Sequence, residues 1–178
     1  NKIYVSAGPD DLTCDNSYYL VGTPLSETGT GTWSGGGSVV IEDEHASSTL
    51  VENLSTGINT FTWSITDNGC TSSDDVIITC NYFKANAGSD QYPATNFTTM
   101  NAGYPGAGAT GEWKTYSGNG DPVDPIDPLT TMNNLGYGLN EFIWRVTWNG
   151  CTYGDTVAII YNPLEAYAGP GGSVCSDD

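Results

Sequence analysis

Positively charged side chains are scarce in this sequence of 178 residues. Four lysines and arginines stand against 21 aspartates and glutamates, which gives a formal net charge of -17. An electrostatic field of this sign repels phosphate backbones and anionic lipid headgroups. We therefore exclude nucleic-acid binding and attachment to an anionic membrane surface, and calcium becomes the cation to consider.

Groups that perform catalysis are scarce as well. The only histidine is His45, and the sequence has no zinc-binding His/Cys spacing, no phosphate-binding loop and no Gly-x-Ser-x-Gly motif. Acid–base and nucleophilic catalysis depend on such placed groups, so we expect no enzyme activity. Long apolar runs are also absent, so we expect no direct membrane insertion. The start at Asn1 indicates a fragment of a longer chain, and we expect that fragment to be monomeric.

An internal repeat organises the sequence. Residues 53–63 align with residues 134–144 at an offset of 81, and the match continues through Asn-Gly-Cys at 68–70 and 149–151. Across residues 53–80, 14 of 28 positions are identical. A period of this length is typical of tandem modules. We predict repeat 1 at residues 1–80, repeat 2 at 81–161, and the truncated start of a third repeat at 162–178.

Within each repeat the apolar residues alternate with polar ones. Phe61, Trp63 and Ile65 follow this period of two, which indicates a strand with one buried face. Asn-Gly follows at once and favours a two-residue hairpin turn. About seven short strands per repeat predict an all-β fold, in which immunoglobulin-like or PKD-like β-sandwiches are arranged end to end as a rod. Trp33 and Trp113 are then core residues of the third strand.

Four motifs of the repeat carry a family resemblance. They are Ala-Gly-Pro-Asp at 7–10, Gly-Thr-Trp at 31–33, Asn-Leu-x-x-Gly-x-Asn-x-Phe-x-Trp at 53–63 and Asn-Gly-Cys-Thr at 68–71. Together they resemble the tandem repeats of very large cell-surface adhesins of Bacteroidetes that act in gliding motility. The resemblance implies type IX secretion, an extracellular position on the outer surface, and a role as spacer and surface-attachment element. Its partners would be an external surface or polysaccharide and the neighbouring repeats of the same chain.

An alternative function also fits a small β-sandwich with exposed aromatic residues. It is a carbohydrate-binding or spacer module of a secreted polysaccharide-degrading enzyme. Trp148, Tyr116, Tyr137 and Tyr153 occur only in repeat 2, at turns or outward positions, and we predict a glycan or surface contact there. Ordinary surface aromatic residues are the plainer interpretation.

Five cysteines leave one without a partner inside the sequence. In an immunoglobulin-like topology the ends of the first and last strands share one pole, which favours a Cys14–Cys80 disulfide. Repeat 2 lacks both cysteines together, since Ala94 and Tyr161 take their places. The rival pairing joins Cys14 to Cys70 and Cys80 to Cys151. Cys175 aligns with Cys14, so we expect its partner outside the fragment.

Carboxylates in the opening segments are candidate calcium ligands. Asp10 and Asp11 lie there in repeat 1, and Asp90 is the repeat 2 counterpart of Asp10. Carboxylates at a module junction can bind calcium and stiffen a rod. The sequence has no Asp-x-Asp-x-Asp-Gly loop, so turn capping is the competing interpretation, and we predict no other cofactor.

Overall fold

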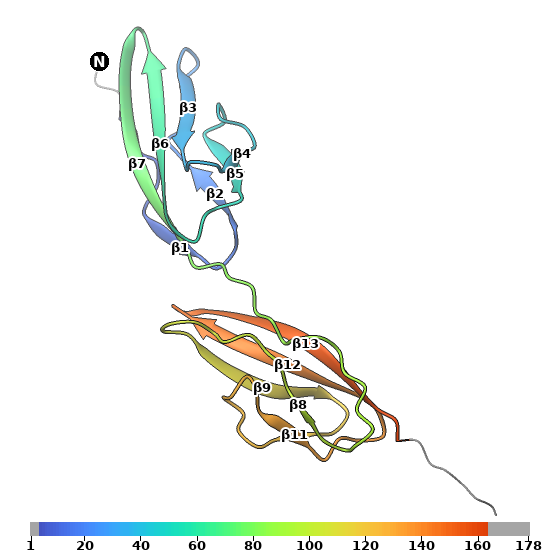
Figure 1. The fold of residues 1–178 in the computed structure, drawn as a ribbon. Coiled ribbons are helices and arrows are strands. Elements are labelled where there is room, and N and C mark those ends of the chain that lie inside the picture. Colours follow the sequence, from blue (N-terminus) through green and yellow to red (C-terminus); the bar gives the residue numbers. More distant parts are fainter. Residues whose placement is uncertain (1–3, 164–178) are drawn as a thin grey trace, which may run out of the picture. The chain divides into compact units, whose positions relative to one another are not determined.

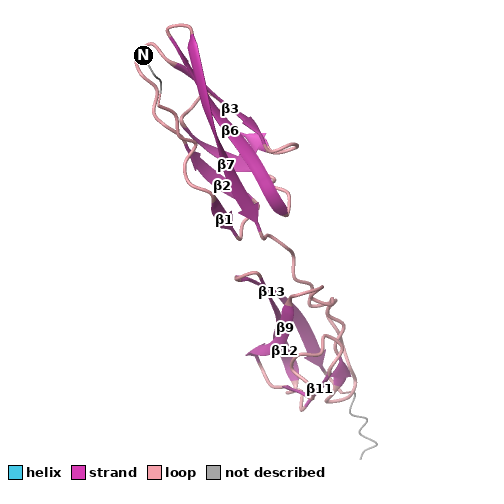
Figure 2. Cartoon of the chain, turned by 90° about the vertical axis from the view of Figure 1, so that its left-hand side faces the viewer, coloured by secondary structure: helices cyan, strands magenta, loops and turns pink. Residues whose placement is uncertain are grey.

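The computed structural model describes residues 4–163, and every regular element in that range is a strand (Figure 2). Among these residues, no helix is long and apolar enough to span a membrane. The chain divides into two compact units. In the described part, unit 1 contains residues 4–84 and 147–153, and unit 2 contains residues 85–146 and 154–163.

Unit 1 is built from two sheets that face each other (Figure 1). Its seven strands are β1 (Asp11–Thr13), β2 (Ser17–Val21), β3 (Thr30–Gly35), β4 (Val40–Ile41), β5 (Ser48–Glu52), β6 (Gly57–Asp67) and β7 (Cys70–Cys80). One sheet has the order β1-β7-β6-β3, and the other has the order β2-β5-β4. The chain therefore changes sheet after β1, β2, β3 and β5, as in an immunoglobulin-like sandwich.

The first strand of unit 1 pairs with the last one in parallel. Asp11, Leu12 and Thr13 lie opposite Ile78, Thr79 and Cys80. All other strand pairs of this unit are antiparallel. The predicted all-β, immunoglobulin-like fold is confirmed, and the described part of repeat 1 has the predicted seven strands.

Unit 2 repeats this plan with shorter strands in one sheet. Its strands are β8 (Thr98–Thr99), β9 (Thr110–Ser117), β10 (Asp121–Pro122), β11 (Thr131–Asn133), β12 (Gly138–Trp148) and β13 (Cys151–Tyr161). The sheets have the orders β13-β12-β9 and β10-β11-β8. A single parallel bridge between Gln91 and Ile159 takes the place of the β1–β7 pair. The ends of β12 and β13 at residues 147–153 belong to unit 1.

Both long hairpins turn at Asn-Gly, as predicted. Asn68 and Gly69 have φ angles of 50° and 77°, and Asn149 and Gly150 have φ angles of 46° and 82°. Two successive positive φ angles define a type I′ turn, whose twist matches the flanking strands. The turn fixes the register of β6 and β7, in which Asp67 lies opposite Cys70.

Two tryptophans form the centre of each core. The rings of Trp33 and Trp63 have centroids 4.9 Å apart, and those of Trp113 and Trp144 are 5.1 Å apart. All four are at most 2% exposed, so the predicted core tryptophans are confirmed. Gly31 makes the packing possible because a Cβ atom at this position would collide with the Trp63 ring. The Gly-x-Trp motif is therefore a packing requirement.

A buried asparagine explains the most strongly repeated motif. Asn140 is fully buried, and its side-chain amide donates hydrogen bonds to the carbonyls of Gly136, Gly138 and Ile159. Its Oδ1 accepts bonds from the backbone amides of Gly136 and Asn119. Asn59 holds the corresponding loop in unit 1. The motif Asn-Leu-x-x-Gly-x-Asn therefore encodes a loop whose backbone groups form hydrogen bonds with the buried side chain of the second asparagine.

We expect Asn140→Ala to lower the free energy of unfolding of unit 2. Several buried backbone groups would lose their partners, which costs about 2–4 kcal/mol in total. Urea denaturation followed by tryptophan fluorescence measures the change. The matched control is Asn96→Ala at an exposed position of the same unit, which should change little. Equal effects of the two substitutions would contradict the role given to Asn140.

Candidate functional site

The tip of the β12–β13 hairpin is covalently bound to the first repeat. The type I′ turn places Cys151 at the first position of β13, and Cys151 forms a disulfide with Cys14, just after β1. The Cα atoms are 5.4 Å apart, and the two residues are 137 positions apart in the sequence. A link that closes so long a loop stabilises the folded chain by roughly 5 kcal/mol in the chain-entropy model.

Two aromatic residues of the same hairpin tip pack against the aromatic residues that follow β7, within unit 1. Phe83 packs edge-on against Trp148 and Tyr153, with ring centroids 6.3 Å and 4.5 Å apart. Tyr82 also packs edge-on against Tyr153, at 5.6 Å. Edge-to-face pairs of this kind add to the stabilisation from buried apolar area. We call Tyr82, Phe83, Trp148 and Tyr153, together with the Cys14–Cys151 disulfide, the tip cluster.

Polar groups complete the tip cluster. The side-chain amide of Asn81 donates a hydrogen bond to the backbone carbonyl of Asn149 at 3.3 Å. The Tyr153 hydroxyl is buried, and no group in the described part of the chain makes a hydrogen bond with it. Burial raises the pKa of the Tyr153 phenol, and the carboxylate of Asp15 raises it further. Tyr153 therefore stays neutral over the physiological pH range and contributes mainly by packing.

The predicted pairing of Cys14 with Cys80 is wrong. Both do lie at one pole, because Thr13 is opposite Cys80 in the β1–β7 register. However, Cys80 is completely buried, and its thiol contacts the backbone carbonyl of Asp15. Cys14 is only half-buried and bonds to the hairpin tip instead. Proximity of two backbones at a pole does not determine where their side chains point.

The rival pairing is wrong too. Cys70 is an exposed free thiol at the start of β7, whereas β1, which precedes Cys14, pairs with the end of β7. The tip of the β6–β7 hairpin and strand β1 lie at opposite ends of unit 1 (Figure 1). Cys151 pairs with Cys14 and not with Cys80. One signal in the sequence points to the observed bond, namely that Cys151 and the two aromatic residues Trp148 and Tyr153 lie within six positions. Cys175 lies outside the described residues.

The structure separates the four candidate contact aromatics. Trp148 and Tyr153 belong to unit 1 and are engaged in the tip cluster, so they do not form a free glycan platform. Tyr116 on β9 and Tyr137 before β12 belong to unit 2 and are 70% and 78% exposed. The Tyr137 ring has Tyr161 as a neighbour, with centroids 6.5 Å apart. Of these four residues, Tyr116 and Tyr137 are therefore the two that are available for an external ligand.

The candidate calcium ligands have partners inside their own units. Asp10 accepts a hydrogen bond from the backbone amide of Ile77, and Asp90 accepts one from the amide of Ala158, both at 2.9 Å. These bonds fasten each opening segment to the last strand of its unit. Within residues 4–163, no three His, Cys, Asp or Glu side chains are grouped so as to hold a metal ion. The geometry favours the capping interpretation for Asp10 and Asp90.

Asp11 is paired with a tyrosine. The Tyr18 hydroxyl donates a hydrogen bond to Asp11 Oδ2 at 2.7 Å. This bond lowers the pKa of the Asp11 carboxyl and raises the pKa of Tyr18 to about 12. The bond therefore persists from neutral pH into the alkaline range, and Asp11 fastens the loop between β1 and β2.

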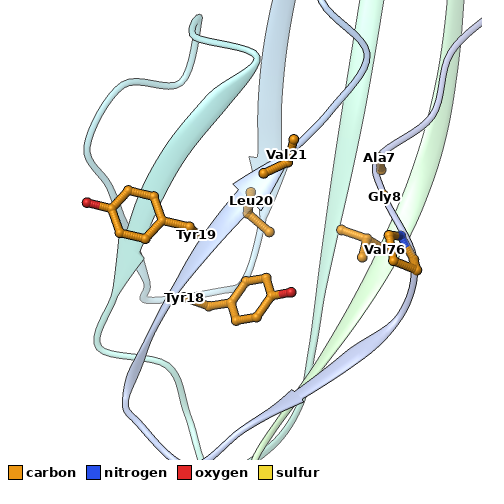
Figure 3. A pocket seen from close by; sticks show the side chains of 8 residues that line it. Ala7, Gly8, Tyr18, Tyr19, Leu20, Val21 and Val76 are labelled. Atoms are coloured by element: carbon orange, nitrogen blue, oxygen red, sulfur yellow. The ribbon is translucent and has the colours of Figure 1, made fainter.

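A small cavity lies beside Tyr18 in unit 1 (Figure 3). It is lined by Ala7, Gly8, Pro9, Tyr18, Tyr19, Leu20, Val21 and Val76 and has a volume of about 160 Å³. The Tyr19 ring points away from it (Figure 3). Ligand sites are generally larger, on the order of 300–1,000 Å³, and carry several converging polar groups. This cavity is a gap at the edge of the two sheets.

Several solved structures are similar to this chain in backbone fold, at low sequence identity. No protein-family model and no curated protein sequence matches it. Extracellular domains 3–5 of Drosophila OTK give a TM-score of 0.40 at 9% identity, covering 85% of this chain and 57% of that one. An I-band fragment of titin gives 0.35 at 12%, covering 86% and 62%. This chain thus spans less than two thirds of either structure.

A third similar structure is a SusE-like surface located polysaccharide binding protein from Bacteroides thetaiotaomicron. It gives a TM-score of 0.40 at 8% identity and covers 90% of this chain and 34% of that one. Similarities of this degree define no family for the chain. The immunoglobulin-like assignment rests on its own strand order.

We expect peptide mapping to find Cys14 linked to Cys151 in the oxidised chain. With Cys175→Ser in every sample, a non-reducing digest should contain this one disulfide-linked peptide pair. Cys70 should react with N-ethylmaleimide in the native state because it is exposed, and Cys80 only after denaturation because it is buried. Cys151→Ser is the control and should abolish the linked pair. A Cys14–Cys80 peptide in the oxidised Cys175→Ser chain that keeps Cys151 would contradict the structure.

Proposed function

We propose that this chain is a non-catalytic repeat module of a large secreted cell-surface adhesin, in which it acts as spacer and attachment element. The observation that carries the proposal is the Cys14–Cys151 disulfide, which binds a residue of repeat 1 to the hairpin tip of repeat 2. A structural disulfide also favours an oxidising, extracellular location. The resemblance of the repeat motifs extends the proposal to a gliding-motility adhesin exported by type IX secretion.

The spacer role follows from how the tip cluster restrains the chain. Separate modules joined by a peptide alone move independently unless a large apolar interface holds them. Here the disulfide acts together with the rings of Tyr82, Phe83, Trp148 and Tyr153 and with the Asn81 hydrogen bond. We infer that successive repeats form a stiff, rod-like array on the outer cell surface.

We propose that the attachment role belongs to repeat 2. Tyr116 and Tyr137 are exposed on unit 2, and flat rings on a hydrated surface are suited to stacking on sugars. The strongly acidic surface excludes anionic lipid as the target and leaves polysaccharide or another external surface. Neighbouring repeats of the same chain are the second class of partner.

We expect small-angle scattering to detect the stiffening. The double variant Cys14→Ser with Cys151→Ser should sample a broader range of maximum dimensions than the oxidised parent chain, because only non-covalent contacts then hold the tip. Cys70→Ser is the matched control, since it removes an exposed thiol and no bond. Superimposable scattering profiles for the parent and the double variant would count against the spacer role.

We expect retention on polysaccharide affinity gels to depend on the exposed tyrosines. Tyr116→Ala with Tyr137→Ala should migrate faster than the parent chain in a gel that contains the recognised glycan. Tyr104→Ala is the control, because Tyr104 is 74% exposed in the same unit but is outside the predicted set. If the double variant were retained as strongly as the parent, attachment would not lie at these two residues.

A further inference from the structure

The tip of the β6–β7 hairpin has the same local structure as the tip that forms the disulfide. Asn68-Gly-Cys-Thr at 68–71 corresponds to Asn149-Gly-Cys-Thr at 149–152. The φ angles of the two turns agree within a few degrees, as described above. Cys70 and Cys151 each begin the returning strand. The two cysteines are therefore presented in the same way.

The surroundings of the two cysteines differ. Cys151 is 1% exposed and forms a disulfide with Cys14, whereas Cys70 is an exposed free thiol. Asn68 and Gly69 are exposed as well, so no described residue of unit 1 covers the turn of the β6–β7 hairpin. The same turn with a cysteine after it thus occurs in both repeats, but only the cysteine of repeat 2, Cys151, forms a disulfide.

We propose that Cys70 forms a disulfide with the Cys14-equivalent cysteine of another immunoglobulin-like module of the same repeat type. The β6–β7 tip is then a docking surface for the pole of that module, as the β12–β13 tip is for the pole of unit 1. The proposal rests on the proposed function as a tandem-repeat spacer and names the partner of this tip. When this bond forms, the two cysteine thiols lose two protons and two electrons. A small-molecule disulfide such as oxidised glutathione accepts them and is reduced to two thiols.

The sequence around both sides of the contact changes together. Tyr82 and Phe83 pack on Trp148 and Tyr153 in the tip cluster. At the corresponding repeat positions the sequence has Lys2 and Ile3 on one side, and Asp67 and Ser72 on the other. Residues 1–3 lie outside the described part, so this comparison concerns sequence alone. The sequence thus has a lysine and an isoleucine at the positions of Tyr82 and Phe83, and an aspartate and a serine at the positions of Trp148 and Tyr153.

The proposed cysteine pairing also predicts which contacts between repeats have no disulfide. Repeat 2 has Ala94 at the position of Cys14, so a hairpin tip that docks on repeat 2 finds no thiol. The third copy regains the cysteine as Cys175. Cross-linked and uncross-linked contacts would then occur along one array.

The test is a longer chain in which a second copy of residues 1–80 precedes the full 178-residue sequence. This fusion keeps the natural spacing between successive repeats, because Asn1 then follows the added Cys80 as Asn81 follows Cys80 in the parent chain. The protein is oxidised with glutathione and digested without reduction. We expect a linked peptide between Cys14 of the added copy and Cys70 of the full chain, and loss of the reactivity of that Cys70 toward N-ethylmaleimide. The Cys14–Cys151 bond of the full chain is the internal control.

Two variants of the fusion test whether the new link depends on Cys70 and on the aromatic contact. Cys70→Ser in the full-chain copy should abolish the new link and leave the control bond. A second fusion restores the aromatic contact at the new tip with Lys2→Tyr, Ile3→Phe, Asp67→Trp and Ser72→Tyr in the full-chain copy, and it should form the link at least as completely. If neither fusion forms the link while the control bond is present, the proposal is wrong. Such a failure would leave the scattering difference of the parent chain unchanged, so it is distinguishable from failure of the spacer role.

Discussion

The positive φ angles of the two Asn-Gly turns are the constraint on which most of this structure depends. A type I′ turn fixes the register of the strands that it joins, and a slip of one residue would exchange the two faces of both strands. In unit 1 such a slip would turn Phe61 and Trp63 out of the core. The same turn determines which residue begins the returning strand, and in both repeats that residue is a cysteine.

The two repeats therefore share their scaffold residues and differ in the residues beside the hairpin turn. The two tryptophans, the buried Asn59 or Asn140 and the hairpin turn are shared by the units, because each satisfies a packing or hydrogen-bonding requirement of one sandwich. The residues beside the turn differ, and they determine what the tip contacts. In repeat 2 they are Trp148 and Tyr153, which pack on Tyr82 and Phe83 of unit 1.

Much of the fold could be predicted because it depends on local patterns. Alternation along residues 61–65 located β6, Asn68-Gly69 located its turn, and recurrence of Trp33 as Trp113 located the core. The cysteine pairing could not be predicted in this way. Topology placed Cys14 and Cys80 at one pole, yet the side chain of Cys80 points into the core and that of Cys14 reaches Cys151.

The candidate site shows the same division. Sequence comparison identified Trp148 and Tyr153 as distinctive, but only the structure separated them from the exposed Tyr116 and Tyr137. Sequence by itself determined the strands, the turns and the repeat, because backbone propensity and alternation act over a few residues. Tertiary structure decided the disulfide and the burial of the aromatic rings, since both depend on contacts between segments more than 60 positions apart.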